Sequence, residues 1–134
     1  MRILKIICLV NLLIFLGLTV NCKAQDNSTE IFAIVETSPT YNGGDEARLK
    51  FLSQNLKYPA IAIEKGTQGT VYVSFVIEKD GSISNITLKR DIGNGCGDEA
   101  IRVVKMMPKW IPGKQQGKLV RVQFIMPISF KLSK

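Results

Sequence analysis

The sequence predicts an α+β fold with its elements in the order helix, strand, strand, helix, strand. Two segments repeat apolar residues at helical spacing, and three others alternate apolar and polar residues as strands do. An Asp-Gly pair between the first two alternating segments predicts a hairpin. The chain has 134 residues, of which 46% are hydrophobic, so it can form one domain with a modest core.

The first helix is predicted to run from Asp45 to about Lys57. Asp45 is a suitable N-cap residue after a loop rich in glycine. Pro59 ends the helix, because the residue before a proline is pushed out of helical geometry. One face carries an apolar stripe, flanked by Phe51, that should pack on the core: Leu49, Leu52 and Leu56.

Two strands follow, joined by a tight turn. Apolar residues alternate from Val71 to Ile77, and Tyr72 and Val76 make the second face of this strand partly apolar. A strand with two apolar faces suits the centre of a sheet. Asp80-Gly81 predicts a two-residue turn that leads into a strand over 82–90.

The second helix is predicted to start at about Glu99, capped by Asp98, and to stop before Pro108. The glycine-rich segment 93–97 before it lacks the Gly-Lys-Ser/Thr ending of a phosphate-binding loop, so it is interpreted as a connector. The stripe that should face the sheet contains Ala100, Val103, Val104 and Met107.

A long amphipathic strand is predicted over Lys118 to Leu132. Its apolar row alternates with an outward row that includes Arg121 and Gln123. Pro127 cannot donate a ladder hydrogen bond, so the strand should lie at a sheet edge or carry a bulge.

Residues 1–24 are predicted to be an export signal cleaved after Ala24. A basic start at Arg2 and Lys5 precedes an apolar run that is interrupted by Asn11. The run is shorter than the ~20 residues of a comfortable membrane span. An uncleaved anchor over residues 3–20 is the first alternative, and lipid attachment at Cys22 is the weakest one.

The charge is +7 for the whole chain and +4 after the leader-like segment. The basic residues are scattered, without the arginine cluster or aromatic-basic pattern typical of nucleic-acid binding, so we expect no nucleic-acid partner. Cys96 is the only cysteine after position 24. We expect it to be a small buried residue; pairing between molecules is the alternative.

The residue types argue against an enzyme, a metal site and a cofactor. The chain has no histidine, the residue most often used for proton transfer and metal binding. The acidic pairs Asp45-Glu46 and Asp98-Glu99 each fall where a helix is predicted to start, which the helix dipole favours.

The segment from Phe51 to Leu132 resembles the TonB C-terminal domain family. Val35-Glu36 and the segment 39–44 also resemble short relatives that carry this domain alone. Each motif is weak alone, but their order and spacing together are specific. They are Tyr58-Pro59, Ala62, Gly66, Gly69, the Val71 to Phe75 strand, Asp80-Gly81, Asp98, Ala100, Trp110, Pro112 and the Val120 to Phe130 strand.

The resemblance implies two helices packed on one face of a three-stranded antiparallel sheet. It also implies that a TonB-box peptide of an outer-membrane receptor is added as a strand beside the last strand. Trp110 is a second candidate for partner contact, with core packing as the alternative. The residues expected to border the peptide are Val120, Arg121, Val122, Gln123, Ile125 and Pro127.

The expected organisation is a leader over 1–24, an extended arm or linker over 25–44 and the TonB-like domain over 45–134. The domain is expected in the periplasm, or held at the inner membrane if the leader stays attached. It would take part in TonB-dependent transport or its regulation. The alternative function is a structural domain that forms homodimers through its edge strand.

Overall fold

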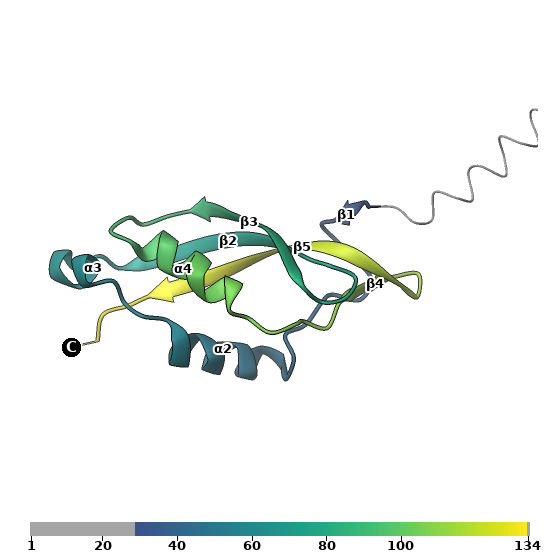
Figure 1. Cartoon of the computed structure of the whole chain (residues 1–134), viewed down its shortest axis with the longest axis horizontal. Coiled ribbons are helices and arrows are strands. Elements are labelled where there is room, and N and C mark those ends of the chain that lie inside the picture. Colours follow the sequence, from purple (N-terminus) through teal and green to yellow (C-terminus); the bar gives the residue numbers. More distant parts are fainter. Residues whose placement is uncertain (1–28, 134) are drawn as a thin grey trace, which may run out of the picture.

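A computed structural model describes residues 29–133 of the chain (Figure 1). Its elements confirm the predicted order, with two short strands and one short helix in addition. In chain order they are β1 (Ile31–Phe32), α2 (Gly44–Asn55), α3 (Ala60–Lys65), β2 (Gly69–Ile77), β3 (Ile83–Arg90), α4 (Cys96–Lys105), β4 (Gly113–Gln115) and β5 (Lys118–Phe130).

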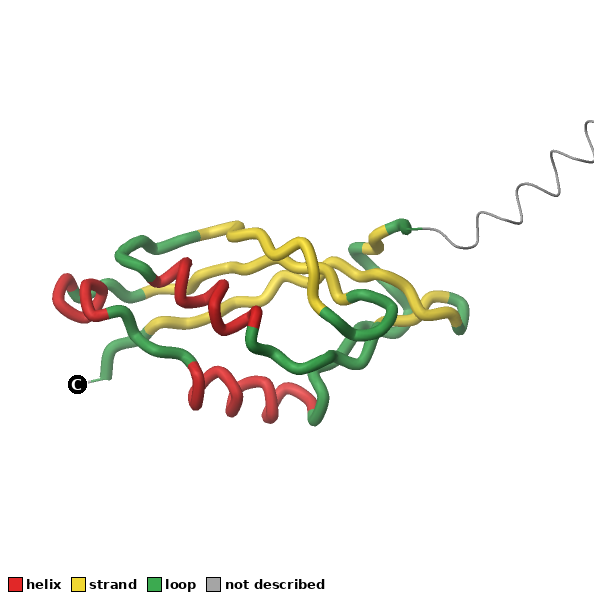
Figure 2. The backbone as a smooth tube through the Cα atoms, in the orientation of Figure 1, coloured by secondary structure: helices red, strands yellow, loops and turns green. Residues whose placement is uncertain are grey.

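The three predicted strands form an antiparallel sheet in the spatial order β5, β2, β3. β2 is central, as its two apolar faces predict. The helices α2 and α4 lie on the same side of this sheet, and α3 lies at its end (Figure 2). The predicted α+β fold class is therefore confirmed. The sheet contains more than three strands, since β1 and β4 also pair with β5.

The β2–β3 hairpin turns at the predicted place but through a longer loop. The N–H of Gly81 donates to the carbonyl of Glu78 at 2.9 Å, and the N–H of Glu78 donates to the carbonyl of Ser82 at 2.8 Å. Gly81 has a φ of 87°, whereas Asp80 stays out of the left-handed region. The Asp80 carboxylate instead accepts the Ser82 N–H at 2.9 Å. The two-residue turn was therefore wrong, because only the glycine takes a positive φ.

Helix α2 differs from its prediction at both ends and along its stripe. Gly43, in a left-handed conformation, is the N-cap, and no side chain caps the helix. Asp45 lies in the first turn and pairs with Arg48 at 3.4 Å. Leu52 is buried, but Leu49 is 59% exposed. The predicted cap was wrong, because the helix begins before Asp45. Leu52, Leu56 and Phe51 contact the core, whereas Leu49 of the predicted stripe does not.

The two other helices begin directly after a proline and a glycine, respectively. Helix α2 ends at Asn55, with the extended Leu56 as its C-cap, so it stops before the predicted Lys57 and before the residue that Pro59 restricts. Pro59 is instead the N-cap of the unpredicted α3. Gly95 is the N-cap of α4, which begins at Cys96 rather than near Glu99. Asp98 therefore lies in the first turn and does not cap the helix.

The core lies between the sheet and the helices. The alternate residues of β5 from Val122 to Phe130 face it, as the alternation predicts. Among the described residues Cys96 is a free, buried thiol, which confirms the burial interpretation; burial raises its pKa. The fully buried side chains include Val71, Val73, Phe75, Ile77, Cys96, Ala100, Val103, Val104 and Met126.

Trp110 belongs to this core. Only 4% of its surface is exposed. Its ring centroid lies 5.1 Å from that of Phe124, 5.5 Å from that of Tyr41 and 5.7 Å from that of Phe75. The core-packing interpretation of Trp110 is confirmed, and the indole has no surface to offer a partner in this structure.

The segment before α2 is joined to the domain rather than extended away from it. Thr37 exchanges backbone hydrogen bonds with Lys114, at 3.1 and 2.9 Å, and Thr40 does so with Ile111, at 3.0 and 2.8 Å. Tyr41 is 5% exposed. The part of the predicted linker from Thr37 onward therefore contributes to the folded unit.

The predicted leader, its cleavage after Ala24 and the alternatives at residues 3–20 and Cys22 lie outside the described residues. Within residues 29–133, none of the helices combines the length and hydropathy that crossing a bilayer requires.

Candidate functional site: the open edge of the last strand

The last strand has different neighbours along its length. β4 pairs with Lys118–Val120, and β1 pairs in parallel with Arg121 and Val122. β2 pairs with the whole stretch from Val122 to Phe130. Val122 thus lies between two strands. Among residues 29–133, by contrast, β2 is the one strand that pairs with 123–130. We call the unpaired side of 123–130 the open edge.

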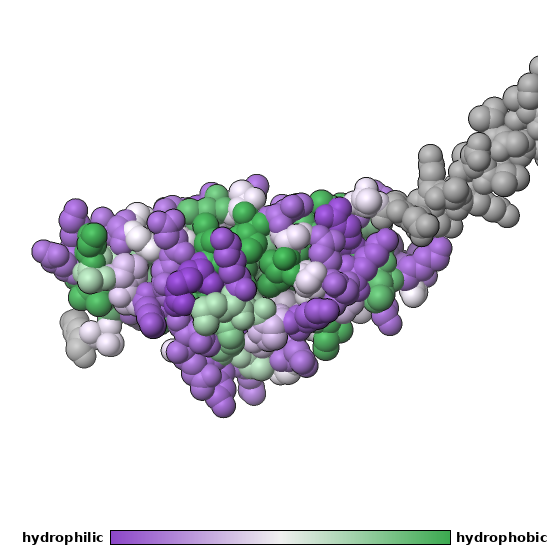
Figure 3. Space-filling view, viewed as in Figure 1, coloured by the Kyte–Doolittle hydropathy of each residue, from purple (hydrophilic) through white to green (hydrophobic). Residues whose placement is uncertain are grey.

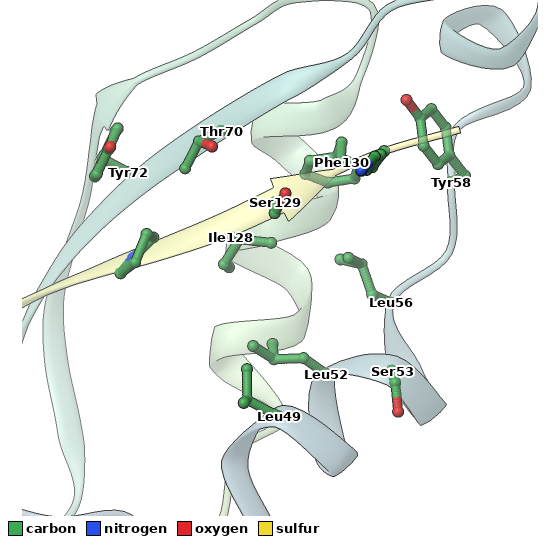
Figure 4. Close-up of a pocket in the computed structure, with 12 residues that line it drawn as sticks. Leu49, Leu52, Ser53, Leu56, Tyr58, Thr70, Tyr72, Ile128, Ser129 and Phe130 are labelled. Atoms are coloured by element: carbon green, nitrogen blue, oxygen red, sulfur yellow. The ribbon is translucent and has the colours of Figure 1, made fainter. Parts of the chain in front are cut away.

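A groove of about 610 Å³ lies along the second half of the open edge. Figure 4 shows leucines of α2 across from the end of β5, with Tyr72 and Thr70 on the adjacent strand. The groove therefore contacts both faces of the sheet at this edge. The lining residues are Leu49, Leu52, Ser53, Leu56, Tyr58, Thr70, Tyr72, Pro127, Ile128, Ser129, Phe130 and Lys131.

Helix α2 is the wall of the groove, and α4 fixes its C-terminal end. The Glu99 carboxylate accepts the backbone N–H of Lys57 at 2.6 Å. Arg102 donates to the backbone carbonyl of Asn55 at 2.8 Å and also pairs with Glu99 at 2.7 Å. The hydrogen bond from Arg102 is the main cause that lowers the pKa of Glu99. These contacts tie the end of α2 to a helix that is itself packed on the sheet.

The end of the groove is formed by aromatic side chains. The rings of Tyr58 and Phe130 meet edge to face, with centroids 5.5 Å apart. The Tyr58 hydroxyl donates to the carbonyl of Thr67. Burial, and to a lesser extent Cys96, raises the pKa of Tyr58, so the phenol is neutral at physiological pH. Aromatic and hydroxyl groups thus border this end of the groove, together with the charged Lys131.

The outward row of β5 carries polar side chains that are partly paired within the domain. Gln123 donates to the Ser74 hydroxyl at 2.9 Å. Arg121 binds Glu78 through two nitrogens, at 2.6 and 3.1 Å. This hydrogen bond is the main cause that lowers the pKa of Glu78, and Ser84 also donates to that carboxylate. Ile125 is 53% exposed.

The structure divides the residues that were predicted to border a peptide. Gln123, Ile125 and Pro127 lie on the open edge, with exposed side chains. Val120, Arg121 and Val122 already pair with β4 or β1. Sequence reasoning missed Leu49, Tyr72 and Ser129 because their role depends on where α2 and β2 lie relative to β5.

The surface and the acidic residues give no sign of a metal centre. Among residues 29–133, no group of three or more His, Cys, Asp or Glu side chains could hold a metal ion. On the face shown in Figure 3, hydrophilic residues cover the rim of the domain and hydrophobic ones gather near its middle.

The solved structures that resemble the chain include two NMR solution structures of the Helicobacter pylori TonB-CTD. The longer matches with 28% identity and a TM-score of 0.45, covering 64% of this chain and 78% of its own. The shorter matches with 26% identity and a TM-score of 0.46, covering 66% and 94%.

The sequence comparisons identify the family. Protein tonB2 of Pseudomonas aeruginosa is 33% identical over 79 residues, which are 58% of this chain and only 28% of that relative's length. Residues 54–132 match the family described as Gram-negative bacterial TonB protein C-terminal. TonB C-terminal domains are non-enzymatic binding and energy-transduction modules. The chain belongs to the TonB C-terminal domain family.

Proposed function

We propose that this domain binds a TonB-box-type peptide of an outer-membrane receptor by adding it as a strand to the open edge of β5. The observation that carries the proposal is that 123–130 pair on one side only and that the second half of this edge borders a largely apolar groove. An unpaired strand edge offers backbone donors and acceptors for affinity, while alternate side chains supply selectivity.

Pro127 indicates which backbone groups face the partner. Successive residues of a strand direct their N–H and C=O groups to opposite edges. A proline fits where its missing N–H would have faced the open edge rather than the neighbouring strand. Gln123, Ile125 and Ser129 share the alternation of Pro127, so their N–H and C=O groups point outward. Pro127 contributes its carbonyl alone.

The two faces at the edge would receive two rows of partner side chains. One row of an added strand would lie against Leu49 and Leu52 of α2, and the other would lie near Tyr72 and Ile125. A single added strand buries less area than a standard protein interface, so we expect weak, transient binding. Such binding suits a contact that has to be made and released during transport.

We place this contact in the periplasm, in TonB-dependent transport or its regulation. A leader cleaved after Ala24 would release the domain, whereas an uncleaved leader would hold it at the inner membrane. Self-association through the same edge is the competing outcome. The domain should therefore be studied over a range of concentrations without peptide, because a mass that doubles with concentration would identify a homodimer.

A titration followed by NMR tests the proposal. The ¹⁵N-labelled chain would be titrated with synthetic TonB-box peptides from receptors encoded in the same genome. We expect amide shifts concentrated at 123–130 with an unchanged molecular mass of the domain. Shifts scattered over the surface, or none at millimolar peptide, would refute strand addition at this edge.

Two substitutions of Ser129 distinguish the contribution of its backbone N–H to binding from that of its side chain. Ser129→Pro removes an outward donor, as Pro127 already does, whereas Ser129→Ala keeps it. Loss of one hydrogen bond of about 1 kcal/mol weakens binding by about fivefold. We expect Ser129→Ala to bind like the unmodified chain and Ser129→Pro to bind about fivefold more weakly. Equal affinities of the two variants would contradict the assigned direction of the backbone groups.

A further inference from the structure

The arm strand β1 occupies the same side of β5 as the open edge. Val122 pairs with Ile77 of β2 and also with Phe32 of β1. A strand has two sides, so β1 must lie on the side away from β2, in line with 123–130. The sheet order β1, β5, β2 agrees. The arm therefore ends where the open edge begins.

Polar contacts on either side of β1 hold the arm in place. Arg121, fixed by its pair with Glu78, donates to the backbone carbonyl of Thr29 at 2.7 Å. After β1, the N–H of Glu36 donates to the Gln115 side chain at 2.9 Å. The backbone bonds between Thr37 and Lys114 follow directly. The arm is thus anchored to the domain from Thr37 onward, whatever β1 does.

β1 itself has little to hold it. It contains two residues, and Ile31 is 39% exposed while the nearby Ile34 is 89% exposed. A segment with few buried apolar contacts and a short ladder opens at low free-energy cost. The arm can therefore leave β5 without unfolding the core.

We propose that β1 and the incoming strand compete for one edge of β5, so that the docked arm limits a partner to the eight residues 123–130. A longer partner strand extends toward Arg121 only by displacing β1. The inference rests on the proposed function and adds a regulatory role for the arm.

The test uses the full chain and two proline variants of the arm. Phe32→Pro disrupts the β1 ladder, while Ile34→Pro places the same residue at an exposed position outside it. Each chain would be titrated with an eight-residue TonB-box peptide and with two twelve-residue versions, extended at either end. Fluorescence of Trp110 confirms that each variant keeps its core.

We expect the unmodified chain and Ile34→Pro to bind the better twelve-residue peptide at most about twofold more tightly than the eight-residue peptide, because the cost of displacing β1 offsets the added contacts. In Phe32→Pro, the better twelve-residue peptide should bind about tenfold more tightly, which corresponds to about 1.4 kcal/mol. In the unmodified chain, amide exchange at Phe32 should accelerate with the twelve-residue peptide and not with the short one.

The outcomes distinguish the two proposals. Peptide binding at 123–130 with no effect of Phe32→Pro and no change in Phe32 exchange would overturn competition and leave strand addition intact. Absence of peptide binding in all three chains would overturn both. If Phe32→Pro does not keep its core, amide exchange at Phe32 in the unmodified chain alone tests the competition. Unchanged exchange with the twelve-residue peptide would then overturn it.

Discussion

Replacing Gly81 by alanine should destabilise the domain far more than the same change at another glycine of similar conformation. Gly81 has φ +87°, and a Cβ placed on it would lie 2.0 Å from the Trp110 carbonyl oxygen. Gly117 has φ +74°, but a Cβ there meets nothing within 4 Å. The pair therefore separates the cost of a positive φ from the cost of a collision.

The expected magnitudes follow from these contacts. An alanine in the left-handed region costs roughly 1–2 kcal/mol, which is the whole effect expected for Gly117→Ala. At Gly81 the Trp110 backbone must also move. This would strain the 2.8 Å hydrogen bond from the Trp110 N–H to the Gly81 carbonyl, worth about 1 kcal/mol. It would also disturb a buried indole, so we expect a total of about 3 kcal/mol or more for Gly81→Ala.

Urea denaturation followed by tryptophan fluorescence measures both values. Trp110 is the only tryptophan in the chain and is buried in the core, so its emission reports unfolding directly. The slope of free energy against urea should match among the three chains if unfolding stays two-state. A free energy of unfolding for Gly81→Ala within about 0.5 kcal/mol of Gly117→Ala would refute the close approach to Trp110.

Three further predictions concern the groove, the pH dependence and the thiol. Leu49→Lys should weaken peptide binding while changing stability by less than about 0.5 kcal/mol, and Ile61→Lys, an equally exposed helical position, should leave binding unchanged; calorimetric titration and urea denaturation check both. Because the native pKa values of Glu78 and Glu99 lie below their ordinary 4.5, both stabilise the fold fully above about pH 4.5, and this contribution is lost as pH falls toward the depressed values. Urea denaturation at pH 7 and pH 4 should therefore show a smaller loss of stability for Glu78→Gln and Glu99→Gln than for the unmodified chain, and an equal loss would contradict these ion pairs. Cys96 should react with a thiol reagent only at the rate of unfolding and immediately in urea, and fast reaction of the native chain would show that the thiol is not buried.

Local periodicity was sufficient to predict the three main strands and α4. In these elements the apolar residues either alternate or repeat at helical spacing, and the same residues form the core. Local sequence patterns failed to predict the ends of helices and the burial of individual helix residues. Pro59 was expected to end a helix but precedes a new one, α3, and Leu49 continues the stripe of α2 without reaching the core. Sequence spacing does not reveal how closely a helix approaches its sheet.

The candidate site could be predicted only in part, because sequence spacing does not show which distant segments meet. The alternation of β5 correctly indicated an outward row. The predicted edge position holds only for 123–130, because β4 and β1 pair with residues 118–122. The pairing of Phe32 with Val122 joins segments about ninety residues apart, and no local pattern marks it. The groove likewise requires α2 and β5 to be placed in space. That Leu49 and Tyr72 line this groove could therefore be learned only from the folded structure.

Amide hydrogen exchange along β5, with and without a TonB-box peptide, tests the central claim most directly. We predict that saturating peptide slows exchange at Ile125 and Ser129, whose N–H groups face the open edge. Amides of the alternate residues, which already pair with β2, should change little. Unchanged exchange at these two positions in a chain that demonstrably binds the peptide would contradict strand addition at β5.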